Sequence, residues 1–170
     1  YLAREELAVR NGVPTAEGAI AAAMAATEVT LCGTPCLVVG FGRIGKLLAH
    51  RLRGLGAEVA VSARRLDDLA WIDAFGYRGL HTNRLAGTLG DFRVVFNTVP
   101  HTVLSGELLR ELPQDCVLIE LASQPGFDRA AAEALGLKCI SALGLPGKAA
   151  PETAARAIWT TLKKIWEEEA

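Results

Sequence analysis

CLVVGFGRIGKLLAHRL, residues 36–52, carries the strongest indication of fold in this chain. Its first four residues are a continuous apolar run, typical of a buried parallel strand, and from Ile44 onward the apolar residues recur with helical spacing. Between the two stands the pattern G-x-G-x-x-G, residues 40–45. In this context the glycines permit a tight turn, a close approach of backbone to a pyrophosphate, and close packing of helix on strand. The stretch predicts a dinucleotide-binding unit; the alternative is a glycine-rich turn without a ligand.

The alternation of strand and helix patterns continues along the chain. Because parallel neighbours need a crossover of about a dozen residues or more, six short apolar strands separated by helices favour a parallel sheet. We expect an α/β, Rossmann-type doubly wound fold: a six-stranded, mostly parallel sheet with helices on both faces and an N-terminal connecting helix. The expected strands cover residues 36–39, 58–62, 77–80, 94–97, 117–121 and 138–141. The expected helices cover residues 14–27 (with Pro14 at the start), 44–55, 67–75, 83–89, 102–112, 129–135 and 151–169.

Length and composition bound the class of protein. The 170 residues are 51% hydrophobic and 22% charged, with a formal net charge of −1. These values exclude a disordered chain and disfavour a general nucleic-acid binder. No early apolar stretch is long enough to span a bilayer, and no signal-peptide pattern opens the chain, so we expect a cytoplasmic protein without a membrane partner. We expect residues 1–31 to be an N-terminal segment with a connecting helix and residues 32–170 to be a Rossmann dinucleotide-binding domain.

The cysteines favour the same cellular setting. Cys36, Cys116 and Cys139 each lie in or beside an apolar strand pattern, where cysteine behaves as a small buried hydrophobe. Cys32 and Cys36 are four residues apart, but no second pair and no nearby histidine completes a zinc site. We expect four reduced thiols and no metal site.

The end of the second expected strand indicates which dinucleotide binds. Domains that bind NAD have Asp or Glu at this position, about 20 residues after the glycine motif, where the carboxylate binds the ribose 2′-hydroxyl. Here the strand ends at Ser62 and continues into Arg64 and Arg65, with no carboxylate at its end. A guanidinium can bind a 2′-phosphate bidentately, and the Ser62 hydroxyl adds a donor, so we expect NADP. Alternatively, the two arginines open the next helix on a solvated face, paired with Asp67 and Asp68.

Polar and glycine-rich loops follow three further strand ends, where ligands of this fold bind. These are residues 97–100 (NTVP), 122–126 (ASQPG) and 144–148 (GLPGK). His101 follows the first of them and is the one histidine near the expected chemistry, so it is a candidate acid or base. The expected cofactor-binding residues are Gly40, Gly42, Arg43, Ile44, Gly45, Ser62, Arg64, Arg65, Asn97, Thr98, Val99 and Pro100.

Taken together, these segments resemble the family formed by the A subunit of dipicolinate synthase. NGVPTAEGAI, residues 11–20, is similar to that family's entry helix, and GLPGKAAPETA, residues 144–154, to its closing segment. The resemblance covers nearly the whole chain. The intervening segments that follow the family's order and spacing are 40–45, 63–64, 97–100 and 121–126.

The resemblance implies that the chain is the C-terminal NADP-binding domain of an enzyme that oxidises dihydrodipicolinate to dipicolinate (pyridine-2,6-dicarboxylate) in sporulation. It implies a small dicarboxylate substrate, NADP as the hydride acceptor, and, as partner, a second, flavoprotein-like subunit; a homo-oligomer is also open. The domain would align the substrate ring with the nicotinamide and hold two carboxylates. The candidate holders are Ser123, Lys148 and the backbone N–H groups of Gly126 and Gly147. Together with His101, Ser123 and Lys148 are also the candidate catalytic residues.

The chain departs from the family in two respects. Family members carry an N-terminal domain of their own, and residues 1–10 resemble only its end. We therefore expect a C-terminal fragment that is inactive alone. In addition, Gln124 and Phe127 stand where a basic residue and a further glycine are expected.

Two other functions stay open. One is a different NADP-dependent oxidoreductase domain, similar to shikimate or 2-hydroxy-acid dehydrogenases. The other is a non-catalytic nucleotide-binding module that docks a partner through its final helix. Trp159 and Trp166 lie seven residues apart on that helix and can share a face. We expect them to pack within the chain rather than against a partner.

Overall fold

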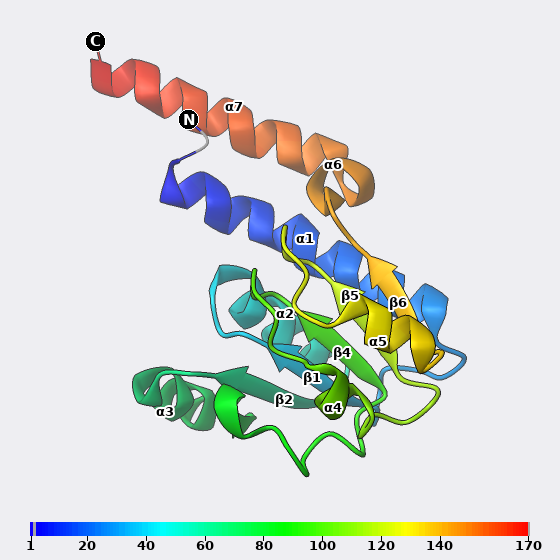
Figure 1. Ribbon diagram of the computed structural model, residues 1–170. Coiled ribbons are helices and arrows are strands. Elements are labelled where there is room, and N and C mark those ends of the chain that lie inside the picture. Colours follow the sequence, from blue (N-terminus) through cyan, green and yellow to red (C-terminus); the bar gives the residue numbers. More distant parts are fainter. Residues whose placement is uncertain (2, 170) are drawn as a thin grey trace.

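A single six-stranded parallel sheet organises the molecule in the computed structural model, which describes residues 1 and 3–169 (Figure 1). The strand order is β3-β2-β1-β4-β5-β6, and every pair is parallel. This confirms the expected Rossmann-type fold. The strands are β1 (Pro35–Val39), β2 (Glu58–Ala63), β3 (Arg78–His81), β4 (Val94–Asn97), β5 (Val117–Glu120) and β6 (Lys138–Ser141).

Helices cover both faces of the sheet (Figure 1). Side chains of β1 alternate between two cores, because successive residues of a strand point to opposite faces: Val38 belongs to one, and Leu37 and Val39 to the other. The first core packs against α1, α2 and α3, and the second against α4, α5 and the segment 85–92. The helices are α1 (Glu5–Ala26), α2 (Arg43–Gly54), α3 (Leu66–Ala74), η1 (Thr82–Arg84, a 3₁₀ turn), α4 (Gly106–Leu109), α5 (Arg129–Ala134), α6 (Leu145–Ala149) and α7 (Pro151–Glu169).

Helix α1 begins earlier than the sequence predicts, so Pro14 lies inside it rather than at its start. Proline removes one backbone donor from a helix interior. Nearby, the Thr15 hydroxyl donates to the Asn11 carbonyl at 2.7 Å. The helix packs against α2, α6 and α7, and these tertiary contacts offset the cost of the proline.

Three further expectations about secondary structure are wrong. The helix expected over 83–89 is only the 3₁₀ turn η1, and the loop expected at 144–148 is largely helix α6. The helix expected over 102–112 is only α4, because the backbone N–H groups of Val103 and Leu104 both donate to the Gly126 carbonyl. That pairing keeps the segment before Ser105 extended, and Ser105 then caps the short helix.

Two expectations about side-chain burial are also wrong. Trp159 and Trp166 do not pack within the described part of the chain: they are 62% and 68% exposed, because α7 turns other positions toward α1. Cys139 is exposed on the edge strand β6, whereas Cys36 and Cys116 are buried. All four thiols are free. Burial raises the pKa of the Cys36 and Cys116 thiols to about 12.

Two negative findings apply to residues 1 and 3–169. No helix there is long and apolar enough to cross a membrane. No group of three or more metal-binding side chains gathers there either.

Candidate functional site

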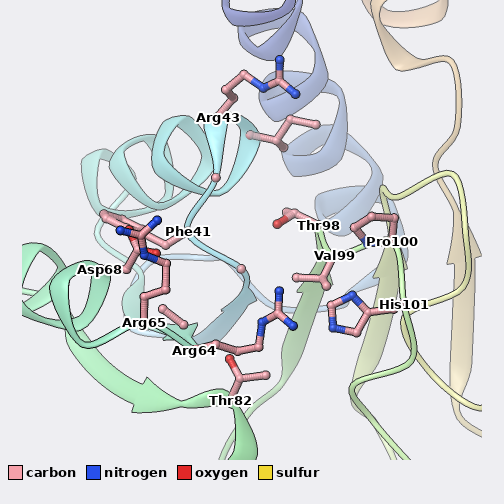
Figure 2. A pocket seen from close by; sticks show the side chains of 14 residues that line it. Phe41, Arg43, Arg64, Arg65, Asp68, Thr82, Thr98, Val99, Pro100 and His101 are labelled. Atoms are coloured by element: carbon pink, nitrogen blue, oxygen red, sulfur yellow. The ribbon is translucent and has the colours of Figure 1, made fainter.

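A cavity of about 580 Å³ lies at the carboxyl ends of β1, β2 and β4 (Figure 2). This is where the strand order reverses, the position at which ligands bind in open parallel sheets. The cavity brings together nine of the twelve expected cofactor-binding residues, together with His101. Its lining residues are Gly40, Phe41, Gly42, Arg43, Ile44, Ala63, Arg64, Arg65, Asp68, Thr82, Thr98, Val99, Pro100 and His101.

The glycine motif forms one wall of the cavity, and its geometry suits a pyrophosphate. Gly40 has a φ of +100°, and a Cβ there would lie 2.5 Å from the Thr98 hydroxyl oxygen. A Cβ on Gly45 would lie 2.1 Å from the Gly40 carbonyl oxygen, so this glycine holds α2 close to the turn. Gly42 lines the cavity and has no atom within 4 Å of an added Cβ. The open space beside Gly42 and the first turn of α2 leave backbone N–H groups available to phosphate oxygens.

Two arginines stand at the end of β2, and they differ in their partners. Arg65 donates to the Asp67 carboxylate, with 2.9 Å between Arg65 Nε and Asp67 Oδ1. This hydrogen bond lowers the pKa of Asp67 and raises the pKa of Arg65. Arg64 has no carboxylate partner within residues 1 and 3–169, and it points into the cavity (Figure 2). Of the two, Arg64 is the guanidinium available to an anionic ligand.

Ser62 does not reach the cavity, although the sequence places it at the right strand end. Its side chain is fully buried and accepts a hydrogen bond from the Thr82 hydroxyl at 3.3 Å. The expected role of Ser62 as a donor to a 2′-phosphate therefore has no support in the geometry. Thr82, which the sequence reasoning did not single out, lines the cavity instead.

The loop after β4 forms the opposite wall. The Thr98 hydroxyl donates to the Val39 carbonyl at 2.8 Å, which ties this loop to the end of β1. Asn97 lies behind the wall and is 1% exposed. Its amide nitrogen donates to the Val99 carbonyl at 2.8 Å, and its amide oxygen accepts from the Val99 N–H at 3.2 Å. Asn97 thus supports the wall from inside the protein. The sequence predicts it as a cofactor-binding residue, but it does not line the cavity.

Sequence reasoning missed Glu120, the last residue of β5. Its carboxylate is buried, with 1% exposure, and accepts three N–H donors. Oε1 accepts from Asn97 Nδ2 at 2.7 Å and from the Ala122 N–H at 2.9 Å, and Oε2 accepts from the Gly126 N–H at 2.7 Å. The one available signal was an acidic residue inside the apolar run VLIEL, residues 117–121.

The three catalytic candidates separate in space. His101 lines the cavity, and Figure 2 shows its ring on the same side as Arg64. Ser123 and Lys148 are exposed and do not line the cavity. The Gly126 N–H, expected to hold a substrate carboxylate, already donates to Glu120. Of these groups, His101 alone lines the cavity.

Comparison with known proteins gives a consistent relationship. Residues 13–130 match the family described as S-adenosyl-L-homocysteine hydrolase, NAD binding domain. The A subunit of dipicolinate synthase from Bacillus subtilis (strain 168) is 36% identical over 97% of this chain and 56% of its own. The crystal structure of the same subunit from Bacillus halodurans has a TM-score of 0.94 and 39% identity, over 96% of this chain and 57% of the other. An L-alanine dehydrogenase structure, at 15% identity with a TM-score of 0.74, covers 89% of this chain and 51% of its own and shares the fold.

The chain thus spans a little over half the length of the dipicolinate synthase proteins that it matches. The resemblance expected from the sequence motifs is confirmed, and so is a nucleotide-binding type of domain.

Proposed function

The chain belongs to the family of S-adenosyl-L-homocysteine hydrolase NAD-binding domains, with the A subunit of dipicolinate synthase among its relatives, and we propose that it binds NADP⁺ for the oxidation of dihydrodipicolinate to dipicolinate. The family and the fold support an oxidoreductase-type domain that binds a nicotinamide cofactor. The choice of NADP⁺, the substrate and the reaction are the proposal. We assign residues 32–170 to cofactor binding and residues 1–31 to a connecting segment.

The observation that carries this proposal is the pairing of a glycine turn with an uncompensated arginine across one cavity. Gly42 and the first turn of α2 offer N–H groups to a pyrophosphate. Arg64, at the end of β2, is within reach of a ribose 2′-phosphate on the adenosine side, and a guanidinium suits that group. Thr98, Val99 and Pro100 then face the nicotinamide half.

The bound cofactor supplies the hydride acceptor; the chain's own residues orient and enclose it. The substrate loses a hydride and a proton as its ring becomes aromatic, so a proton acceptor is needed beside the hydride path. His101 lines the cavity and is our candidate for that acceptor. We further propose that residues outside this chain and a second, flavoprotein-like subunit complete the substrate site, because Ser123 and Lys148 lie away from the cavity.

Calorimetric titration with NADP⁺ and NAD⁺ tests the cofactor assignment. We expect measurable binding of both, with NADP⁺ at least about tenfold tighter, because one guanidinium–phosphate contact contributes on the order of 1.5–3 kcal/mol. Equal affinities would contradict NADP⁺ selectivity, and no binding of either would contradict the proposed function.

An activity assay tests the substrate assignment. The second subunit is mixed with full-length protein, NADP⁺ and dihydrodipicolinate, and the ultraviolet absorbance of the pyridine product is followed. We expect product only when the nucleotide is present. Tight NADP⁺ binding without any product would instead support a different NADP-dependent oxidoreductase.

A further inference from the structure

Glu120 carries a buried negative charge that the proposed cofactor chemistry does not yet use. The residue ends β5, and its Cα is the register partner of Asn97 at the end of β4. Its side chain is 1% exposed and forms no ion pair with Lys, Arg or His among residues 1 and 3–169. A buried carboxylate without a cation is costly, so its presence calls for a physical account.

The hydrogen bonds around Glu120 are those of an ionised carboxylate. Two backbone N–H groups and one amide N–H donate to its two oxygens. An ionised carboxylate only accepts, whereas a protonated one also needs an acceptor for its own O–H. The site is therefore built to hold a negative charge.

The charge lies behind one end of the cavity. Glu120 binds Asn97, and Asn97 binds both the N–H and the carbonyl of Val99, whose side chain lines the cavity. Arg64 marks the adenosine end, at β2. With the pyrophosphate over the glycine turn of β1, the second half of a dinucleotide extends toward β4 and β5. The end nearer Glu120 is thus the one that would hold the nicotinamide.

We propose that Glu120 sets the oxidation-state preference of the cofactor site, by favouring the positively charged oxidised nicotinamide over the neutral reduced form. This inference rests on the proposed function. The protein's means of tuning a cofactor include charges near its reactive ring. Two unit charges about 10 Å apart, at an effective dielectric constant of about 20, interact strongly enough to change an affinity about tenfold. A fixed carboxylate behind the wall would act in this way while touching neither substrate nor cofactor.

A purely structural role for Glu120 predicts a different result. Its three hydrogen bonds also hold the loops after β4 and β5 in place, so any replacement disturbs the wall. That disturbance weakens the oxidised and reduced dinucleotides alike, because the two differ by one charge and little in shape. The ratio of the two dissociation constants therefore reports the charge and not the wall.

The test is the affinity of the protein for NADP⁺ and for NADPH, measured for the wild type, Glu120→Gln and Glu58→Gln. Glu58, exposed at the opposite end of β2, is the matched control, because its replacement removes the same charge far from the cavity. For Glu120→Gln we expect the preference for NADP⁺ over NADPH to fall about threefold to tenfold. For Glu58→Gln we expect it to stay unchanged. An unchanged ratio in Glu120→Gln, or an equal fall in both variants, overturns the proposal.

A second measurement holds even if Glu120→Gln fails to fold. The wild type itself is expected to bind NADP⁺ at least about threefold more tightly than NADPH. Equal or tighter binding of NADPH overturns the inference while leaving the proposed function standing. Failure of the wild type to bind either form overturns the proposed function, and this inference with it.

Discussion

The two ends of the cavity are built on opposite physical principles. At the end of β2, Arg64 and Arg65 are exposed, and Arg65 is paired with Asp67 in solvent. At the ends of β4 and β5, Asn97 and Glu120 are buried and fully hydrogen-bonded. Exposed charges can change which ligand binds at little cost to the fold, whereas a buried network links ligand binding to stability. Mutations at the two ends should therefore differ in whether they change the stability of the fold or the affinity for a ligand.

Replacing Gly126 by alanine is expected to disrupt the buried end most strongly. A Cβ there would lie 1.9 Å from Asn97 Nδ2, and Asn97 cannot move without losing its bonds to Val99 and Glu120. We expect a loss of about 2–4 kcal/mol in the free energy of unfolding, measured by denaturant titration.

Gly147→Ala is the matched control for that substitution. Gly147 lies in helix α6 and has nothing within 4 Å of an added Cβ, so we expect no loss of stability. If both variants unfold at the same denaturant concentration as the wild type, the loops after β4 and β5 are not held by this network.

Replacing Arg64 by alanine is expected to act on the ligand and not on the fold. We expect the affinity for NADP⁺ to fall about tenfold to thirtyfold, with the affinity for NAD⁺ and the melting temperature unchanged. Calorimetric titration of both nucleotides measures the first effect, and a thermal melt measures the second.

Arg65→Ala is the comparison that tests the distinction between the two arginines. Because the Arg65 guanidinium is already engaged by Asp67, we expect a smaller loss of NADP⁺ affinity than in Arg64→Ala. A larger loss would mean that Arg65 leaves Asp67 to bind the phosphate.

Salt should separate the two ends of the cavity without any mutation. The Debye length falls from about 10 Å at 0.1 M to about 3 Å at 1 M, so exposed charges are screened far more than buried ones. Over that range we expect the NADP⁺ preference over NAD⁺ to fall about threefold, measured by titration. A preference that does not respond to salt would place the phosphate-binding group in a buried position.

Acid should give the smallest effect. A 2′-phosphate loses one negative charge below about pH 6, so its attraction to Arg64 weakens there. Asp67 does not contribute, because its pKa is lowered from 3.8 by the Arg65 hydrogen bond. The ion pair between Arg65 and Asp67 stabilises the folded chain above the ordinary aspartate pKa. This stabilisation is lost only as the pH falls through the lowered pKa of Asp67. Between pH 8 and pH 5.5 we expect the preference of the wild type for NADP⁺ over NAD⁺ to fall about twofold. We expect the preference of Arg64→Ala to stay unchanged over the same range.

Much of the fold could be predicted because local patterns and tertiary packing agree. Strand β4 and helix α7 lie where the apolar runs place them. The helix expected over 102–112 failed for a tertiary reason, since Val103 and Leu104 pair with Gly126, far along the chain. The start of α1 was predicted wrongly, at Pro14, for a similar reason. Packing of α1 against α2, α6 and α7 stabilises a helix that continues on both sides of the proline.

The candidate site divides along similar lines. Residues placed by the motif itself, such as Gly42, and by its expected neighbours, such as Arg64, line the cavity. Ser62 and Asn97 stand at the expected strand ends but turn their side chains inward. One residue of register decides on which face of a strand a side chain lies, and a polar residue at a strand end carries no signal of that face.

Local sequence patterns were enough to predict the alternation of strands and helices, the phosphate-binding turn and the absence of a carboxylate at the end of β2. These features depend on local spacing and on residue types with distinctive backbone or charge properties. The pairing of Arg65, the availability of Arg64 and the burial of Glu120 behind the cavity wall became visible only in the folded chain. Those facts depend on contacts between residues that are distant in the sequence. Asn97 and Glu120, for example, lie on neighbouring strands and are 23 residues apart. Hydrogen bonds of that kind leave no local pattern in the sequence.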